Sequence, residues 1–153
     1  MTHTIENSLI TAILCIIIFI PIYLAVRSAR IKKTKKISNE LSLIEKDLDL
    51  ALQAIEQFDS FVLAIDRGKK IIIKMDLKDY SPQLINLKSI TDCTLVEKRR
   101  GAAINQLQLV LIGKDQQALH TIIFYQQYVD NEGRLKRNIR LAAQWEVMIK
   151  AII

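Results

Sequence analysis

The longest uninterrupted apolar pattern lies near the N-terminus. Residues 9–26 read "LITAILCIIIFIPIYLAV", eighteen residues without a charged side chain. A helix of this length is roughly 27 Å long, which suits a bilayer whose hydrocarbon core is about 30 Å thick. Pro21 and the many β-branched residues disfavour a helix in water, but they are tolerated in lipid, where the backbone has no other hydrogen-bond partner. The pattern predicts a transmembrane helix over residues 9–26, with a kink near Pro21.

The segment that follows this run, residues 27–36, is strongly basic and contains no acidic residue. Its six basic residues are Arg27, Arg30, Lys32, Lys33, Lys35 and Lys36. Residues 1–8 contain no lysine or arginine, so the order is the reverse of a cleaved signal peptide, whose basic region precedes the apolar one. The positive-inside rule therefore predicts that residues 1–8 form an extracytoplasmic tail and that the chain after residue 26 lies in the cytoplasm.

The charge of the whole chain does not indicate a nucleic-acid partner. A formal net charge of +6 would favour one if the charge were spread over the surface. The six residues of the basic segment account for all of it, because the remaining 16 lysines and arginines equal the 16 acidic residues. We interpret the segment chiefly as a topology signal, with contact to anionic lipid headgroups as a secondary consequence.

A second pattern, of helical period, extends from Ile37 to Phe58. Its apolar positions are separated by alternating steps of four and three residues, and they are Ile37, Leu41, Ile44, Leu48, Ala51, Ile55 and Phe58. This spacing predicts a helical spacer over residues 37–59. A parallel homodimer through residues 37–58 stays open but is disfavoured, because Glu40 of one chain would face Glu45 of its twin. Packing on the chain's own domain or on a different partner is favoured.

After Phe58 the pattern changes to the period of two that is typical of strands. Strands are predicted at residues 61–66, 71–75, 83–87, 90–98, 105–113 and 118–129. The alternation is cleanest in the fifth, where Leu107, Leu109 and Leu111 share one face. Residues 135–153 return to a helical period and predict an amphipathic helix. The predicted fold class is α+β: a small antiparallel β-sandwich or open barrel, capped by a C-terminal helix.

Five segments of this region carry a resemblance to a known family. They are "AIDRGKKIII", "INLKSITDCTLVEK", "LQLVLI", "IIFYQ" and "AAQWEVMIKAI". In their order they resemble the bacterial pleckstrin-homology-like (PH-like) domains, over residues 60–153. The resemblance implies a seven-stranded sandwich that ends in one helix, although only six strands are predicted here. It also implies a binding or scaffolding module without catalytic apparatus, of the kind used for lipid headgroups, peptides or protein partners.

The same resemblance implies a candidate site. In phosphoinositide-binding members the first hairpin loop carries basic residues, and Arg67, Lys69 and Lys70 stand at that position. Together with the basic residues of segment 27–36, they are the candidate contacts to lipid headgroups. An ordinary solvated hairpin turn is the favoured alternative, both here and at a second basic loop formed by Lys98, Arg99 and Arg100.

The sequence offers no pattern for catalysis, a metal or a cofactor. His3 and His120 are expected on opposite sides of the membrane, and the four glycines all fall in predicted turns. Cys15 and Cys93 are interpreted as buried thiols and not as a disulfide pair.

The function predicted from the sequence is therefore that of a non-enzymatic binding module. The chain is expected in the inner (cytoplasmic) membrane of a bacterium, crossing it once, with its PH-like domain held at the cytoplasmic face for a protein partner. The alternatives are an anionic-lipid-sensing membrane protein that uses its basic loops, or an accessory subunit of a membrane complex.

Overall fold

The computed structural model describes the backbone of residues 2–153 and the side chains of residues 16–28 and 31–153. The chain divides into two compact units, one up to Ile44 and one from Glu45 to Ile153. The first contains most of one long helix, and the second contains both β-sheets and the C-terminal helix.

Helix α1 extends without interruption over Thr2–Asp47, with Pro21 inside it. All the side chains described between residues 16 and 26 are exposed, with Phe19 at 66 %. Within residues 16–28 and 31–153, whose side chains are described, no helix is both long enough and apolar enough to cross a membrane. Residues 9–15 of the predicted transmembrane segment lie outside those residues.

The prediction of a helical spacer up to residue 59 is correct to Asp47 and wrong beyond it. The helix ends in a Schellman motif: the Leu50 N–H donates to the Glu45 carbonyl oxygen at 2.8 Å, and the Asp49 N–H donates to that of Lys46 at 3.4 Å. Asp49 occupies the left-handed position of the motif with a φ of 50°. Aspartate adopts this conformation more readily than most residues, so the helix ends without a glycine.

The segment between α1 and the first strand is held in place by hydrogen bonds from its backbone N–H groups. Four consecutive N–H groups donate hydrogen bonds, those of residues 50 to 53. Leu50 donates to the Glu45 carbonyl at 2.8 Å, and Leu52 to the Glu45 side chain at 2.9 Å. Ala51 donates to an Asp66 carboxylate oxygen at 2.7 Å, and Gln53 donates to the Ile65 carbonyl at 2.9 Å. The connection is therefore an ordered part of the second unit.

Strand β1, Ala54–Gln57, lies where the spacer helix was predicted. It pairs antiparallel with β2, Phe61–Asp66, and its side chains alternate between half-buried and exposed. The edge of β2 provides backbone partners that a helix at this position would not use. Strand β1 brings the number of strands in residues 2–153 to seven, and it is the one strand that was not predicted from the sequence.

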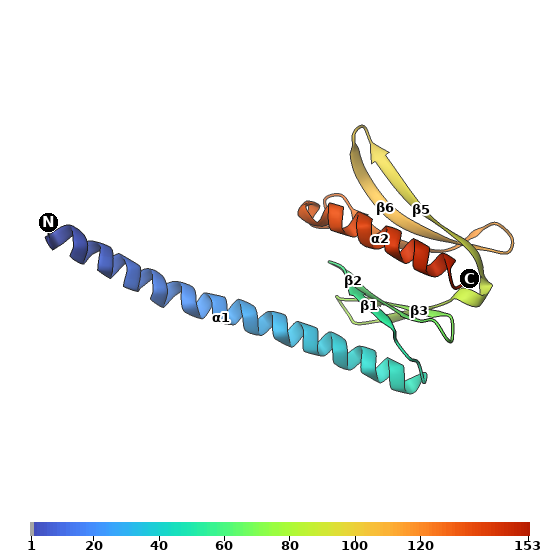
Figure 1. The fold of residues 1–153 in the computed structure, drawn as a ribbon, viewed down its shortest axis with the longest axis horizontal. Helices are drawn as coiled ribbons and strands as arrows, with labels where there is room; N and C mark the ends of the chain where they lie inside the picture. Colours follow the sequence, from blue (N-terminus) through green and yellow to red (C-terminus); the bar gives the residue numbers. More distant parts are fainter. Residues whose placement is uncertain (1) are drawn as a thin grey trace. The chain divides into compact units, whose positions relative to one another are not determined.

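The remaining elements confirm the predicted α+β order of strands followed by a helix (Figure 1). The first sheet has the order β1-β2-β3-β4, and the second has the order β5-β6-β7, with every pair antiparallel. The strands not yet bounded are β3 (Ile71–Asp76), β4 (Pro82–Asn86), β5 (Ile90–Arg100), β6 (Ala103–Gly113) and β7 (Ala118–Gln126). Single 3-10 turns, η1 (Leu87–Ser89) and η2 (Glu132–Arg134), precede β5 and helix α2 (Leu135–Lys150).

The core lies between the two sheets and α2, which occupies the side where the sheets diverge (Figure 1). Leu107, Leu109 and Leu111 of β6 are fully buried, as their alternation predicts. Trp145 of α2 is 1 % exposed and belongs to the same cluster. Phe124 of β7 also belongs to it, and its ring centroid lies 5.0 Å from that of Phe58, in an edge-to-face contact. One apolar cluster therefore joins both sheets to the C-terminal helix.

Candidate interaction surface

The three basic residues proposed for a headgroup site lie in the β2–β3 turn, residues 67–70. Because β1 precedes β2, this is the second hairpin turn of the domain and not the first. The first, residues 58–60, contains no lysine or arginine. The expectation that Arg67, Lys69 and Lys70 stand in the first hairpin loop is therefore wrong, because it was made without strand β1.

The side chains of this turn also point to different partners. The Lys69 ammonium donates a hydrogen bond to the Leu48 carbonyl oxygen at 3.1 Å. It also donates to two groups of Asp49, the side-chain carboxylate at 3.2 Å and the backbone carbonyl oxygen. Lysine is favoured there, since the last carbonyls of a helix carry partial negative charge. The Arg67 guanidinium lies 3.3 Å from the Met148 sulfur of α2. Lys70 is half-buried, with a φ of 58°. The three residues do not form a common site.

A buried carboxylate, Asp66, organises the turn. It is 2 % exposed, and its two oxygens accept the Ala51 N–H at 2.7 Å and the Lys69 N–H at 2.8 Å. The backbone hydrogen bond from Ala51, followed by that from Lys69, lowers the pKa of Asp66 from its usual value of 3.8. Asp66 thus joins the connection after α1 to the β2–β3 turn, a role that its position at a strand end did not reveal.

The other candidate basic residues lie on α1 and at the end of β5. Of the segment 27–36, the side chain of Arg30 lies outside the described residues, and the other five basic side chains are exposed on α1. At the end of β5, Arg99 donates two hydrogen bonds to Glu97, at 2.6 Å and 3.1 Å. Lys98 and Arg100 beside it are exposed.

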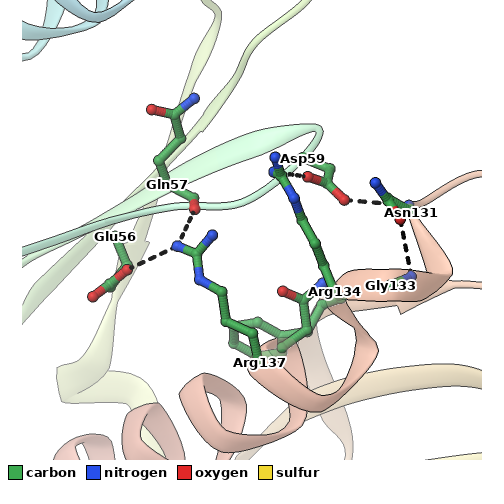
Figure 2. A network of polar contacts seen from close by, with 9 residues as sticks. Glu56, Gln57, Asp59, Asn131, Gly133, Arg134 and Arg137 are labelled. Carbon is green, nitrogen blue, oxygen red and sulfur yellow. Dashed lines mark hydrogen bonds and ion pairs between the residues drawn. The ribbon is translucent and has the colours of Figure 1, made fainter.

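The start of α2 is fixed to the first sheet by polar contacts, which Figure 2 shows. Arg134 forms an ion pair with Asp59, whose second oxygen accepts the Asn131 N–H at 3.3 Å. Arg137 donates to the Gln57 carbonyl oxygen of β1 at 3.2 Å. Arg134 at the end of η2 and Arg137 in the first turn of α2 are therefore engaged in positioning the helix.

Further along α2, an open groove of about 660 Å³ is lined by the helix and by Arg67 of the β2–β3 turn, and we call it the α2 groove. Its lining is mostly apolar and contains no carboxylate; the residues are Arg67, Arg140, Ala143, Gln144, Val147, Met148, Ala151 and Ile152. Val147 is 68 % exposed. The sequence did carry one signal of this surface, because Val147 is a large apolar residue outside the buried stripe of Leu141 and Trp145.

The histidine and thiol chemistry is limited in the part of the chain with described side chains. His120 is half-buried in β7, opposite Leu111 of β6. In that part no three histidine, cysteine, aspartate or glutamate side chains are grouped to hold a metal ion. His3 and Cys15 lie outside it.

The prediction that Cys93 is a buried thiol is confirmed, and it has a chemical consequence. Cys93 is fully buried, its sulfur lies 3.6 Å from the Glu146 carbonyl oxygen, and burial raises the thiol pKa to about 11. Since the thiolate is the nucleophile, we expect maleimide at pH 8 to label Cys93 at least about a hundredfold more slowly than an exposed cysteine. The rate is measured in a Cys15→Ser chain and compared with the same chain carrying Asp115→Cys and Cys93→Ser.

Denaturant should remove the difference between the two cysteines, because unfolding exposes both. Equal labelling rates in the folded protein would contradict the buried position of Cys93.

Comparison of the chain with known protein families, curated proteins and solved structures gives no match. The residues of this chain are therefore the basis on which its function is proposed.

Proposed function

We propose that this chain is a membrane-anchored, non-enzymatic binding protein that holds a PH-like domain at the cytoplasmic face of the inner membrane for a protein partner. The observation that carries the proposal is the α2 groove, an open and mostly apolar surface that includes the exposed side chain of Val147. Exposed apolar surface of this kind is typical of interaction sites. The PH-like assignment is supported by the order of four antiparallel strands, three antiparallel strands and a closing helix.

The anchor in this proposal is the uncharged segment of residues 9–26, with the basic segment 27–36 as its cytoplasmic flank. Three features of the sequence support this anchor: eighteen uncharged residues, a basic flank on one side, and no lysine or arginine before them. Anchoring by this segment would keep the domain at the membrane without any lipid-binding loop.

A protein partner is favoured over a lipid headgroup as the ligand of the domain. A headgroup site needs several basic side chains directed at one phosphate. In the β2–β3 turn, Lys69 is engaged at the end of α1 and Arg67 contacts Met148. The α2 groove, by contrast, combines arginine, methionine and an exposed aliphatic side chain, and the first two are enriched at protein interfaces.

Topology is the first test of this proposal. Because Cys93 is buried, its labelling does not report on orientation, and an exposed cysteine is needed. In a chain without native cysteines, we expect Asp115→Cys in the β6–β7 turn to react with a membrane-impermeant maleimide only after the cells are permeabilised. Thr4→Cys should react in intact cells. The protein should also stay in the pellet after extraction with alkaline carbonate, and labelling of Asp115→Cys in intact cells would rule out the orientation.

Partner binding is the second test. The full chain, tagged at its C-terminus and purified from native membranes in mild detergent, is expected to retain a protein partner in a fixed ratio. A preparation that contains only the chain and lipid would contradict the proposal.

A further inference from the structure

We propose that the α2 groove is the surface that binds the partner, and that its occupant is an amphipathic helix of another protein with acidic residues beside its apolar stripe. This inference rests on the proposed function, because it names the surface and the chemistry of the partner.

The apolar part of the groove has the geometry of a helix-packing surface. Ala143 and Val147 of α2 and Ala151, the residue that caps its C-terminus, follow one another at intervals of four residues, so they lie on one side of the helix. Val147 is 68 % exposed although it lies within a regular sixteen-residue helix. Two alanines flank this larger side chain, and such a row lets the backbone of a second helix approach closely. The surface thus presents one protruding apolar side chain, Val147, with a small alanine side chain before it and another after it along the helix.

The charge of the groove indicates an acidic occupant. Arg140 lies two turns from Val147, and Arg67 reaches the groove from the β2–β3 turn. The Arg67 guanidinium contacts the Met148 sulfur, which is only a weak acceptor, so its charge is available to a carboxylate. Arginine forms bidentate hydrogen bonds with carboxylates, and these fix the orientation of the pair in addition to the charge attraction. A partner with acidic residues about two turns apart would match both arginines.

The length of the groove distinguishes a helix from a small ligand. The lining residues extend from Arg140 to Ile152, just past the end of α2, and the part within the helix, residues 140–150, is roughly 15 Å long at the helical rise of 1.5 Å per residue. This corresponds to about three turns of a partner helix, the common length for recognition of a helix in a groove. A single headgroup would fill only one end of such a surface.

The test uses the full chain in its native membranes, with a photoreactive residue introduced as Val147→p-benzoylphenylalanine. After illumination, the crosslinked peptide is identified by mass spectrometry. We expect a segment of another protein with apolar residues three and four apart and acidic residues beside them. The double variant R67E/R140E should lower the crosslinking yield about tenfold, because two attractions become repulsions. The matched control K98E/K114E changes the charge equally at two exposed lysines outside the groove and should leave the yield unchanged.

Several outcomes would overturn the inference. Val147 could crosslink to lipid, to a second copy of this chain, or to a basic or unstructured segment, or the yield could survive R67E/R140E. Further photoreactive positions at Leu84, Leu119 and Tyr128 separate this failure from that of the proposed function. A protein captured at those positions but not at Val147 would refute the α2 groove and keep the binding role, whereas no protein at any position would refute both. Thermal unfolding of each variant confirms that the fold is retained.

Discussion

Replacing Trp145 with alanine is expected to lower the free energy of unfolding by about 3–5 kcal/mol. Trp145 is 1 % exposed, and it packs in the apolar cluster that α2 shares with both sheets. Its removal would leave a cavity at the point where the three layers meet. Since domains of this kind are stabilised by only about 5–15 kcal/mol in total, the variant should be close to unfolded at physiological temperature.

The measurement is denaturant unfolding followed by far-UV circular dichroism, because Trp145 is the only tryptophan and its fluorescence is lost in the variant. Val147→Ala is the matched control, two positions further along α2 and 68 % exposed. It should change stability by no more than about 0.5 kcal/mol. Equal losses in the two variants would show that α2 does not direct this face into the core.

Replacing Asp66 with asparagine is expected to cost about 1.5–3 kcal/mol, the range for hydrogen bonds to a charged group. The two carboxylate oxygens accept the N–H groups of Ala51 and Lys69. An amide has one accepting oxygen, so one of the two N–H groups would face an NH₂ group instead. The loss is measured by thermal and denaturant unfolding at pH 7, with the exposed Asp115→Asn as control, for which we expect no more than about 0.5 kcal/mol.

The same carboxylate should make stability depend on pH in the acid range. The pKa of Asp66 is lower in the folded chain than its usual value of 3.8, so the unfolded chain binds a proton more readily. Its contribution is therefore present in full above pH 3.8 and is lost as the pH falls from there through the lower folded pKa. Unfolding midpoints of the wild type should fall more steeply over this range than those of Asp66→Asn. Parallel curves would exclude Asp66 as a source of the dependence.

The strands were predictable where side-chain alternation and turn residues agreed. Phe61–Asp66 was predicted with the bounds that the structure has, because an apolar run ends at a turn with Gly68. The final strand ends at Gln126, three residues before its predicted end, and the chain turns at Tyr128 with a φ of 67°. A strand end that is set by backbone conformation is not visible in the alternation of apolar and polar residues.

The end of α1 and strand β1 were not predictable from the pattern for a related reason. Ile55 and Phe58 continue the helical spacing of four and three residues, so the pattern gives no sign of a change. What ends the helix is the conformation of Asp49 and the pairing of Ala54–Gln57 with β2. The second of these is a tertiary interaction, and it outweighs local preference.

Only the part of the α2 groove that lies on α2 itself could be predicted from the sequence. The exposed Val147 follows from the helical spacing of α2, but Arg67 joins the groove from 81 residues away through its contact with Met148. The Asp66 contact to Ala51 likewise spans fifteen residues. Side chains brought together by the fold of the sheets cannot be read from periodicity, which reports on one element at a time.

The four hydrogen-bonded N–H groups at residues 50–53 have a mechanical consequence. This connection cannot lengthen without breaking hydrogen bonds, because its N–H groups donate to Glu45 on one side and to Asp66 and Ile65 on the other. Within the second unit, a pull on Glu45 would be carried through residues 50–53 into β2, whose side chains are buried along its whole length. An added residue in this segment would remove at least one of these hydrogen bonds and weaken that coupling.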